Sequence, residues 1–411
     1  MKRNFLLAAV FMFFCINIVL IGFLIQKSDI IEETSFFPDK KARPEIEYLQ
    51  ASALQSFGEL SKYFSDLAKK KGGAYAYEIL KAAPVPPGTD MHLLGHIVGD
   101  VLYGQEGLDG IKVCTHDFRN ACSHTIVVGL LLEQGESAFP QIVETCYQAP
   151  GGSGAYTMCF HGLGHGVLAY TAYDLEKAVE LCEKTGTPEY GYEEASQCIS
   201  GTIMEILSGV HDQEAWARQY KKYLKEDDPL YPCSAQFIPE HARYLCYVYL
   251  TPHLFEAAGA ILANPTPYDY KKAFPFCNEI PISDMNNRDA CYGGFGKEFV
   301  VLSQDRDIRN VDAMTDEQMG NVYKWCLLAD TKDGVISCIE HATNSLYWGG
   351  ENNRGTAIRF CRLLRSADHQ EACFINLIGA VQTYIRDPDY KKEFCEELPD
   401  SYRGKCQQHL L

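Results

Sequence analysis

Residues 174–182, DLEKAVELC, end in a cysteine, and a second cysteine opens the apolar stretch CISGTIMEILSG at residues 198–209. The first stretch places apolar residues at helical spacing among charged ones, which is typical of a short amphipathic helix that ends at Cys182. The second stretch, which begins at Cys198, is apolar enough for a buried helix. Together they predict a helical hairpin whose connecting loop carries a cysteine at each end.

The same pattern recurs along the chain. PYDYKKAFPFC ends at Cys277 and DPDYKKEFC ends at Cys395, while CYGGFGKEFVVLSQD and CFINLIGAVQTYI are apolar segments that open with a cysteine. The spacing of successive first cysteines runs from 32 residues (Cys114 to Cys146) to 51 residues (Cys182 to Cys233), which is the range of helical repeat arrays. We therefore expect an all-α fold of tandem hairpins over residues 86–411, arranged as a solenoid or as a closed α/α toroid.

The cysteine count predicts that disulfides staple these hairpins. Apart from Cys15, sixteen of the 17 cysteines form an orderly series of neighbours, which suits an oxidising compartment. Closing a loop of about 15 residues stabilises the fold by about 3 kcal/mol. Free thiols or cysteine zinc sites are the alternative, but no C-x-x-C pair is present. The expected pairs are Cys114 with Cys122, Cys146 with Cys159, Cys182 with Cys198, Cys233 with Cys246, Cys277 with Cys291, Cys326 with Cys338, Cys361 with Cys373, and Cys395 with Cys406.

The N-terminus predicts a membrane anchor. The basic start Met-Lys-Arg-Asn precedes an uncharged apolar run over residues 5–25, which is long enough to cross the hydrocarbon core. The basic flank stays in the cytoplasm, so the C-terminal domain is expected to be extracytoplasmic. A cleaved signal peptide is the alternative, although no A-x-A-like site follows the run. We expect a single-pass signal anchor at residues 1–28, a linker with N-terminal helices at residues 29–85, and then the repeat domain.

The composition narrows the class of partner. The formal net charge is −17 and no cluster of Lys and Arg is present, which disfavours nucleic acid. The membrane, through the N-terminal helix, and a protein or small-molecule ligand are the expected partners.

Two family resemblances accompany the repeat. The hairpin length, with one cysteine ending a helix and another opening the next, resembles the cysteine-rich Sel1-like repeat proteins over roughly residues 90–411. ACYGGFG at residues 290–296 and CFHGLG at residues 159–164 are similar to the Gly-rich helix starts of lanthionine-cyclase-like α/α toroids. The second resemblance implies a closed ring of hairpins. Its cysteine zinc site is not expected, because every cysteine of the repeats has a disulfide partner.

Histidines recur in register at the starts of the N-terminal repeats. His124 and His161 each follow a cysteine by two positions, and His92 lies at the matching place in an earlier copy without cysteine. Stacked helices would bring these positions to one surface, and residues four positions further on share the same face. Two imidazoles at i and i+4 can chelate one transition-metal ion. The candidate ligands are His92, His96, His124, His161, His165 and Asp100.

A structural role for the same residues stays open. The flanking glycines can serve close helix packing, and a histidine in a first helical turn can cap a neighbouring carbonyl. Most of the scattered histidines are interpreted as surface or local structural residues; the scattered set is His211, His241, His253, His341, His369 and His409. The discriminating geometry is whether the five candidate histidines point into a common cavity.

Two functions follow from this sequence. The first is a membrane-anchored, extracytoplasmic repeat protein that binds a partner and holds a metal ion or polar ligand in its histidine cluster. The alternative is a metal-dependent hydrolase or oxidoreductase in which Asp100 or Asp117 acts as the base and bound metal activates water. The identity of the metal stays open.

Overall fold

The computed structural model describes residues 44–52, 54, 56–115, 117–149, 152–187, 192–261, 264–349, 354–385 and 387–411. The chain divides after Ser52 into two compact units. Helix α2 (Pro44–Ala51) belongs to the first unit, and all helices from α3 to α21 belong to the second. The expected signal anchor, residues 1–28, lies outside the described residues. None of the described helices has the length and apolar character needed to cross a membrane.

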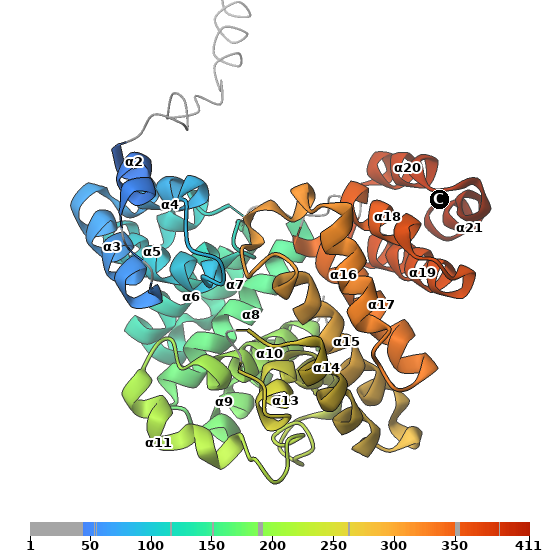
Figure 1. Ribbon diagram of the computed structural model, residues 1–411. Helices are drawn as coiled ribbons and strands as arrows, with labels where there is room; N and C mark the ends of the chain where they lie inside the picture. Colours follow the sequence, from blue (N-terminus) through green and yellow to red (C-terminus); the bar gives the residue numbers. More distant parts are fainter. Residues whose placement is uncertain are drawn as a thin grey trace, which may run out of the picture. The chain divides into compact units, whose positions relative to one another are not determined.

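The described residues of the second unit form helices joined by turns and loops, and none of them forms a strand. The all-α prediction is therefore confirmed for the part of the chain that the structure describes. One set of helices, here called the inner row, packs each member against the next along the chain (Figure 1). The inner row comprises α5 (Met91–Glu106), α6 (Ala121–Gln134), α8 (Gly152–Tyr170), α10 (Glu193–Ser208), α12 (Glu240–Tyr249), α15 (Met285–Leu302), α17 (Lys332–Gly349), α19 (Ala367–Tyr384) and α21 (Asp400–Leu410).

Shorter helices connect successive members of the inner row. Four of them, α7, α9, α16 and α18, pack against the inner helices before and after them. The α-helices of this set are α7 (Phe139–Tyr147), α9 (Leu175–Cys182), α11 (Gln213–Tyr223), α13 (Thr251–Ala257), α14 (Pro267–Ala273), α16 (Asp316–Cys326), α18 (Arg354–Leu363) and α20 (Pro388–Glu397). Two further helices, α3 (Phe57–Lys71) and α4 (Gly73–Ala82), precede the inner row. The 3-10 helices are η1 (Gly107–Lys112), η2 (Gly135–Ala138), η3 (Glu183–Thr185), η4 (Phe274–Glu279), η5 (Ile282–Asp284) and η6 (Ile308–Ala313).

All eight predicted disulfides are confirmed. Each one ties the chain before an inner helix to one of the first eight residues of that helix, and every one of the sixteen cysteines is buried in the core. In the hairpin of residues 174–209, Asp174 caps α9 by accepting from the Lys177 backbone N–H, and α9 ends at Cys182. The bonds join Cys114–Cys122, Cys146–Cys159, Cys182–Cys198, Cys233–Cys246, Cys277–Cys291, Cys326–Cys338, Cys361–Cys373 and Cys395–Cys406.

Glycines let α8 and α10 meet backbone to backbone. A Cβ atom on Gly164 would lie 1.9 Å from the Cys198 carbonyl oxygen, and one on Gly201 would lie 1.9 Å from the His161 carbonyl oxygen. No side chain other than hydrogen fits at such a separation, so these glycines set the distance between the two helices. The close approach at Gly164 fixes the level at which α8 presents its histidines.

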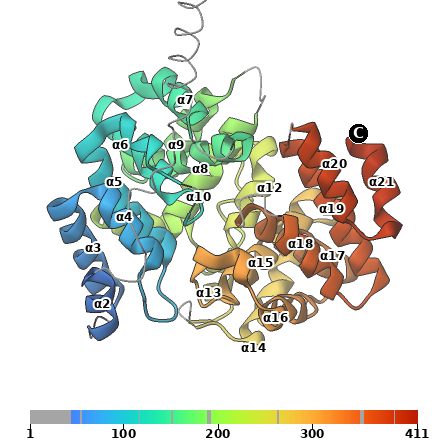
Figure 2. The same cartoon turned by 90° about the horizontal axis from the view of Figure 1, so that it is seen from above.

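Contacts between distant segments curve the inner row around a common interior. The Gly88 backbone N–H donates to the Asp305 carbonyl at 2.8 Å, and Arg119 Nη2 donates to Ser345 Oγ at 2.8 Å. These bonds join the beginning of the row to α17 and the turn after α15. In the two views, α19 and α21 continue the row away from α5 (Figures 1 and 2).

Candidate metal centre and adjoining cavity

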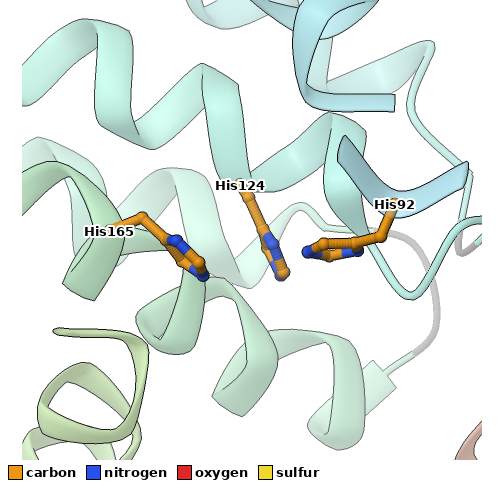
Figure 3. A group of neighbouring side chains, drawn as sticks. All are labelled: His92, His124 and His165. Carbon is orange, nitrogen blue, oxygen red and sulfur yellow. The ribbon is translucent and has the colours of Figure 1, made fainter. Parts of the chain in front are cut away.

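The five predicted histidines converge in one buried cluster. His92 and His96 come from α5, and all five side chains are at most 8% exposed. Neighbouring rings have centroids 4.6 to 6.5 Å apart. The rings of His92, His124 and His165 project from three different inner helices, with centroids 5.4 to 6.5 Å apart (Figure 3). The shared register in the sequence therefore becomes a shared position in space.

Asp100, the sixth predicted ligand, does not join the cluster. Its side chain is exposed, and it belongs to neither of the donor groups that could hold an ion. The reason is helical geometry, because eight residues from His92 to Asp100 turn the helix about 80° past two full turns. Asp117, the other predicted base, pairs with Lys81 at 3.2 Å, and Thr115 Oγ1 donates to it. His116 lies outside the described residues.

His211 is a sixth histidine of the cluster, and the sequence did not distinguish it from the other scattered histidines. Its side chain is 5% exposed, and its ring lies 5.6 Å from that of His96 and 6.0 Å from that of His165. It follows Gly209, whose left-handed backbone (φ +62°) ends α10 and turns the chain back toward the interior. No repeat register marks His211. The one signal in the sequence was Glu205, a carboxylate within an otherwise apolar segment.

Glu205 orients two of the histidines. Its Oε2 accepts from His165 Nδ1 at 2.9 Å and from His211 Nδ1 at 3.0 Å. Its Oε1 accepts from the Tyr173 hydroxyl and from the His211 backbone N–H. An ionised carboxylate has about four acceptor positions, so Glu205 is saturated and fixes both rings with Nε2 facing the cluster. Burial alone would raise its pKa, but the charge and hydrogen bonds of His211 and His165 hold the pKa of Glu205 well below its usual value.

Two further rings are held through Nδ1. His92 Nδ1 donates to the Phe118 carbonyl oxygen at 2.6 Å, and His161 Nδ1 donates to Ser200 Oγ at 2.8 Å. Ser200 must accept here, because its own hydroxyl donates to the Gln197 carbonyl at 2.7 Å. Each neutral ring therefore keeps a lone pair on Nε2, which is the form in which histidine binds metal.

Several ring nitrogens of the cluster are buried without any protein partner. They are His96 Nδ1, both nitrogens of His124, His165 Nε2 and His211 Nε2. Burial lowers the pKa of His92 to about 3, and it also lowers the pKa values of His96, His124, His161 and His165. These five rings are therefore neutral at physiological pH. A group of uncharged imidazoles with unpaired buried nitrogens has the donor set of a transition-metal site.

The donor atoms are close enough to share an ion. Nitrogens of His92, His124 and His165 lie within 4.8 Å of one another, and a second group joins His165 to Glu205 and His211. Nitrogen ligands at 2.0–2.1 Å from a tetrahedral ion lie about 3.3 to 3.4 Å apart. A small inward rotation of the three rings would reach that separation. Since Glu205 is saturated, it orients ligands, and the histidines are the candidate ligands.

A left-handed turn supports this centre from the α6 side. Phe118, Arg119 and Asn120 have φ values of 60°, 54° and 62°, and the Cys114–Cys122 disulfide closes the loop around them. Three consecutive non-glycine residues in this conformation store strain, which is found chiefly at functional sites. The turn places the Phe118 carbonyl on His92, turns Arg119 inward and starts α6.

A cavity of about 280 Å³ adjoins the cluster. Its lining combines the histidines His92, His124 and His161 with cationic, polar and apolar side chains. Arg119, Lys297 and His341 were not singled out as cavity residues by the sequence. The cavity is lined by His92, Arg119, Asn120, His124, Gly154, Ala155, Thr157, Met158, His161, Gln197, Met204, Tyr244, Leu245, Val248, Tyr249, Lys297, His341, Asn344, Ser345 and Trp348.

Fold and site together define a disulfide-stapled, all-α protein with a buried histidine cluster beside a small internal cavity. Comparison of the chain with protein-family models, with curated proteins and with solved structures gives no match.

Proposed function

We propose that the protein binds a transition-metal ion through its histidine cluster and exposes that ion to a small molecule in the adjoining cavity. The observation that carries this proposal is the set of buried, unpaired ring nitrogens on His96, His124, His165 and His211. Leaving several such nitrogens without partners is costly, and a metal ion would satisfy them together.

Imidazole donors suit zinc, copper, iron and nickel. Thiolate ligands are not available from the repeats, because all sixteen of their cysteines are oxidised in disulfides. Eight disulfides support the extracytoplasmic location that is part of this proposal. A bound ion would supply Lewis acidity, or a coordinated water with a pKa near 7.

The cavity favours a metal-dependent enzyme of the hydrolase or oxidoreductase class. His92, His124 and His161 belong both to the cluster and to the cavity wall, so a molecule in the cavity would reach the metal directly. The second candidate is a binding protein that holds metal or a polar ligand without chemistry. It is supported by the absence of any carboxylate among the described residues that line the cavity. Asp100 and Asp117 do not line it, so neither is placed to act as a base on a molecule bound there.

Metal content tests the proposal. The full chain would be purified without an affinity tag, under oxidising conditions, and analysed by elemental mass spectrometry after exposure to zinc, copper, iron and manganese. We expect stoichiometric metal in the wild type and in the exposed control His409→Ala, and loss of metal in the double variant His161→Ala/His165→Ala. Circular dichroism would establish that the double variant is folded. Metal-free wild-type protein after these exposures would refute the proposal.

A further inference from the structure

Arg119 is a cation of the cavity wall, and the charges of the nearby Glu298 and Asp90 favour its charged form without a direct ion pair among the described residues. Its Nη2 donates to Ser345 Oγ at 2.8 Å, while its Nε is buried with no acceptor. Among the described residues, no carboxylate forms an ion pair with this guanidinium. Burial lowers the pKa of Arg119, which shows that the group is held away from water, although arginine remains charged. A desolvated, unpaired cation is costly, and an anion in the cavity would offset that cost.

The other cation of the wall is already neutralised. Lys297 Nζ pairs with the Glu298 carboxylate and lies 4.7 Å from the centre of the Tyr249 ring. His341 is neutral, because burial lowers its pKa to about 4. The unbalanced charge of the wall therefore belongs to Arg119, and a metal ion at the histidines would add more positive charge on the neighbouring wall.

Apolar side chains form part of the remaining wall, beside polar ones such as Thr157, Gln197 and Asn344. Met158, Val248, Leu245 and Trp348 line the cavity together with the Tyr249 ring. Its volume of about 280 Å³ is at the lower end for small-molecule sites, which begin near 300 Å³. A planar guanidinium matches the two oxygens of a carboxylate, and apolar walls suit an uncharged aromatic or aliphatic body.

We infer that the cavity binds a small organic acid, with its carboxylate on Arg119, its apolar body against Trp348 and Met158, and its far end at the histidine cluster. This inference deepens the proposed function by naming the substrate class, and it rests on that function for the role of the metal. The left-handed turn at residues 118–120 accounts for the placement, because one strained segment positions both Arg119 and the carbonyl that fixes His92.

Three small probes test the inference by binding rather than by activity. Benzoate carries a planar carboxylate, benzamide is its neutral counterpart, and phenyl phosphate carries a different anion. Saturation-transfer NMR on the full chain is expected to show benzoate binding to the wild type, with benzamide about 10- to 100-fold weaker, as for loss of a charged hydrogen bond. Equal binding of benzoate and benzamide, or no binding of benzoate, would overturn the inference.

Variants of Arg119 locate the binding site. Arg119→Gln is expected to weaken benzoate about 10- to 100-fold, and Arg119→Lys, which keeps the charge but loses the paired geometry, to weaken it less. The control is Arg218→Gln, since Arg218 is exposed and pairs with Glu214 on α11. Circular dichroism and thermal unfolding would show that the variants fold. Unchanged benzoate binding in Arg119→Gln would refute the assignment. If phenyl phosphate binds through Arg119 and benzoate does not, the inferred carboxylate ligand is wrong and the cavity binds a phosphate ester.

The metal content of the same samples separates the two proposals. Arg119→Gln is expected to keep its full metal content, because Arg119 is not among the candidate ligands. Wild-type protein that contains no metal but binds benzoate through Arg119 would refute the metal centre and support the anion site. Protein that contains stoichiometric metal but shows no Arg119-dependent benzoate binding would support the metal centre and refute the anion site.

Discussion

The Nε2 atoms of His92 and His96 lie 3.1 Å apart on successive turns of α5. His92 donates through Nδ1 to a backbone carbonyl, so its Nε2 is free to accept a proton or to bind a metal. The separation is close to that of two nitrogen ligands on one ion, about 3.3 to 3.4 Å for a tetrahedral site. We expect X-ray absorption of the metal-loaded protein to show nitrogen ligands at about 2.0–2.1 Å for zinc and no sulfur at about 2.3 Å. A sulfur shell would contradict the histidine assignment.

Removing the charge of Glu205 is expected to weaken the metal centre. Glu205→Gln loses the carboxylate that fixes the tautomers of His165 and His211, and such changes typically reduce metal affinity about 10- to 100-fold. Competition with a chelator of known affinity would measure the change. Glu214→Gln is the matched control, because the Glu214 side chain is 87% exposed. Equal affinities in the two variants would mean that Glu205 does not orient the ligands.

Gly162 leaves room for the His124 ring. A Cβ atom at residue 162 would lie 2.5 Å from His124 Cδ2, so Gly162→Ala must displace that ring or separate α6 from α8. We expect a loss of about 1–3 kcal/mol in the free energy of unfolding, measured by denaturant titration, together with weaker metal binding. Gly104→Ala is the control in α5, where an added Cβ meets nothing within 4 Å, and it should stabilise the helix by up to about 1 kcal/mol. A Gly162→Ala protein as stable as the control would show that the ring has spare room.

Disulfides at the two ends of the row are expected to differ in their effect on the site. Cys114–Cys122 closes eight residues and Cys361–Cys373 closes twelve, so loss of either should cost about 2.5 to 3 kcal/mol in free energy of unfolding. The first bond also closes the left-handed turn that holds His92 and Arg119. We therefore expect Cys114→Ser/Cys122→Ser to lower metal affinity and Cys361→Ser/Cys373→Ser to leave it unchanged. Metal titration would contradict this if both double variants behaved alike.

The metal-free protein is expected to lose stability on acidification. His92, His96, His124, His161 and His165 have lowered pKa values in the folded state, so below about pH 6.5 the unfolded chain takes up protons that the folded chain does not. Each such group lowers the free energy of unfolding by up to about 1.4 kcal/mol per pH unit down to its folded pKa. His211 acts in the opposite direction, because Glu205 raises its pKa against the effect of burial.

Outside the cluster, burial lowers the pKa of His341 to about 4, which adds to the loss, and raises the pKa values of Asp100 and Glu340 to about 6 and about 7, which opposes it. The histidines with lowered pKa values are more numerous, so we expect a net loss. Urea unfolding with a chelator present, at about pH 7.5 and about pH 5.5, would measure it. Equal free energies of unfolding at the two pH values would mean that the rings are already protonated, or are in contact with water, in the folded protein.

Local patterns predicted the hairpins, the disulfides and five histidines, because each of these depends on neighbours in the chain or on a repeated register. His211 was missed because it lies in a loop after α10, where no register applies. Lys297 and Ser345 reach the cavity only because the inner row curves, and that curvature arises from contacts between segments more than 200 residues apart, such as Arg119 with Ser345. Asp100 was wrongly expected beside the histidines because a step of four residues does not match the helical period over two turns.

The cluster draws its side chains from four consecutive inner helices, α5, α6, α8 and α10, and from the turn that follows α10. Helical repeat arrays in general can gain or lose a unit while their neighbours continue to stack. Here the insertion or deletion of one hairpin between α5 and α10 would carry one, two or three of the six histidines out of reach of the others. The number of repeats in this stretch is therefore fixed by the site, whereas α19 and α21, which carry no part of it, are free to vary in copy number.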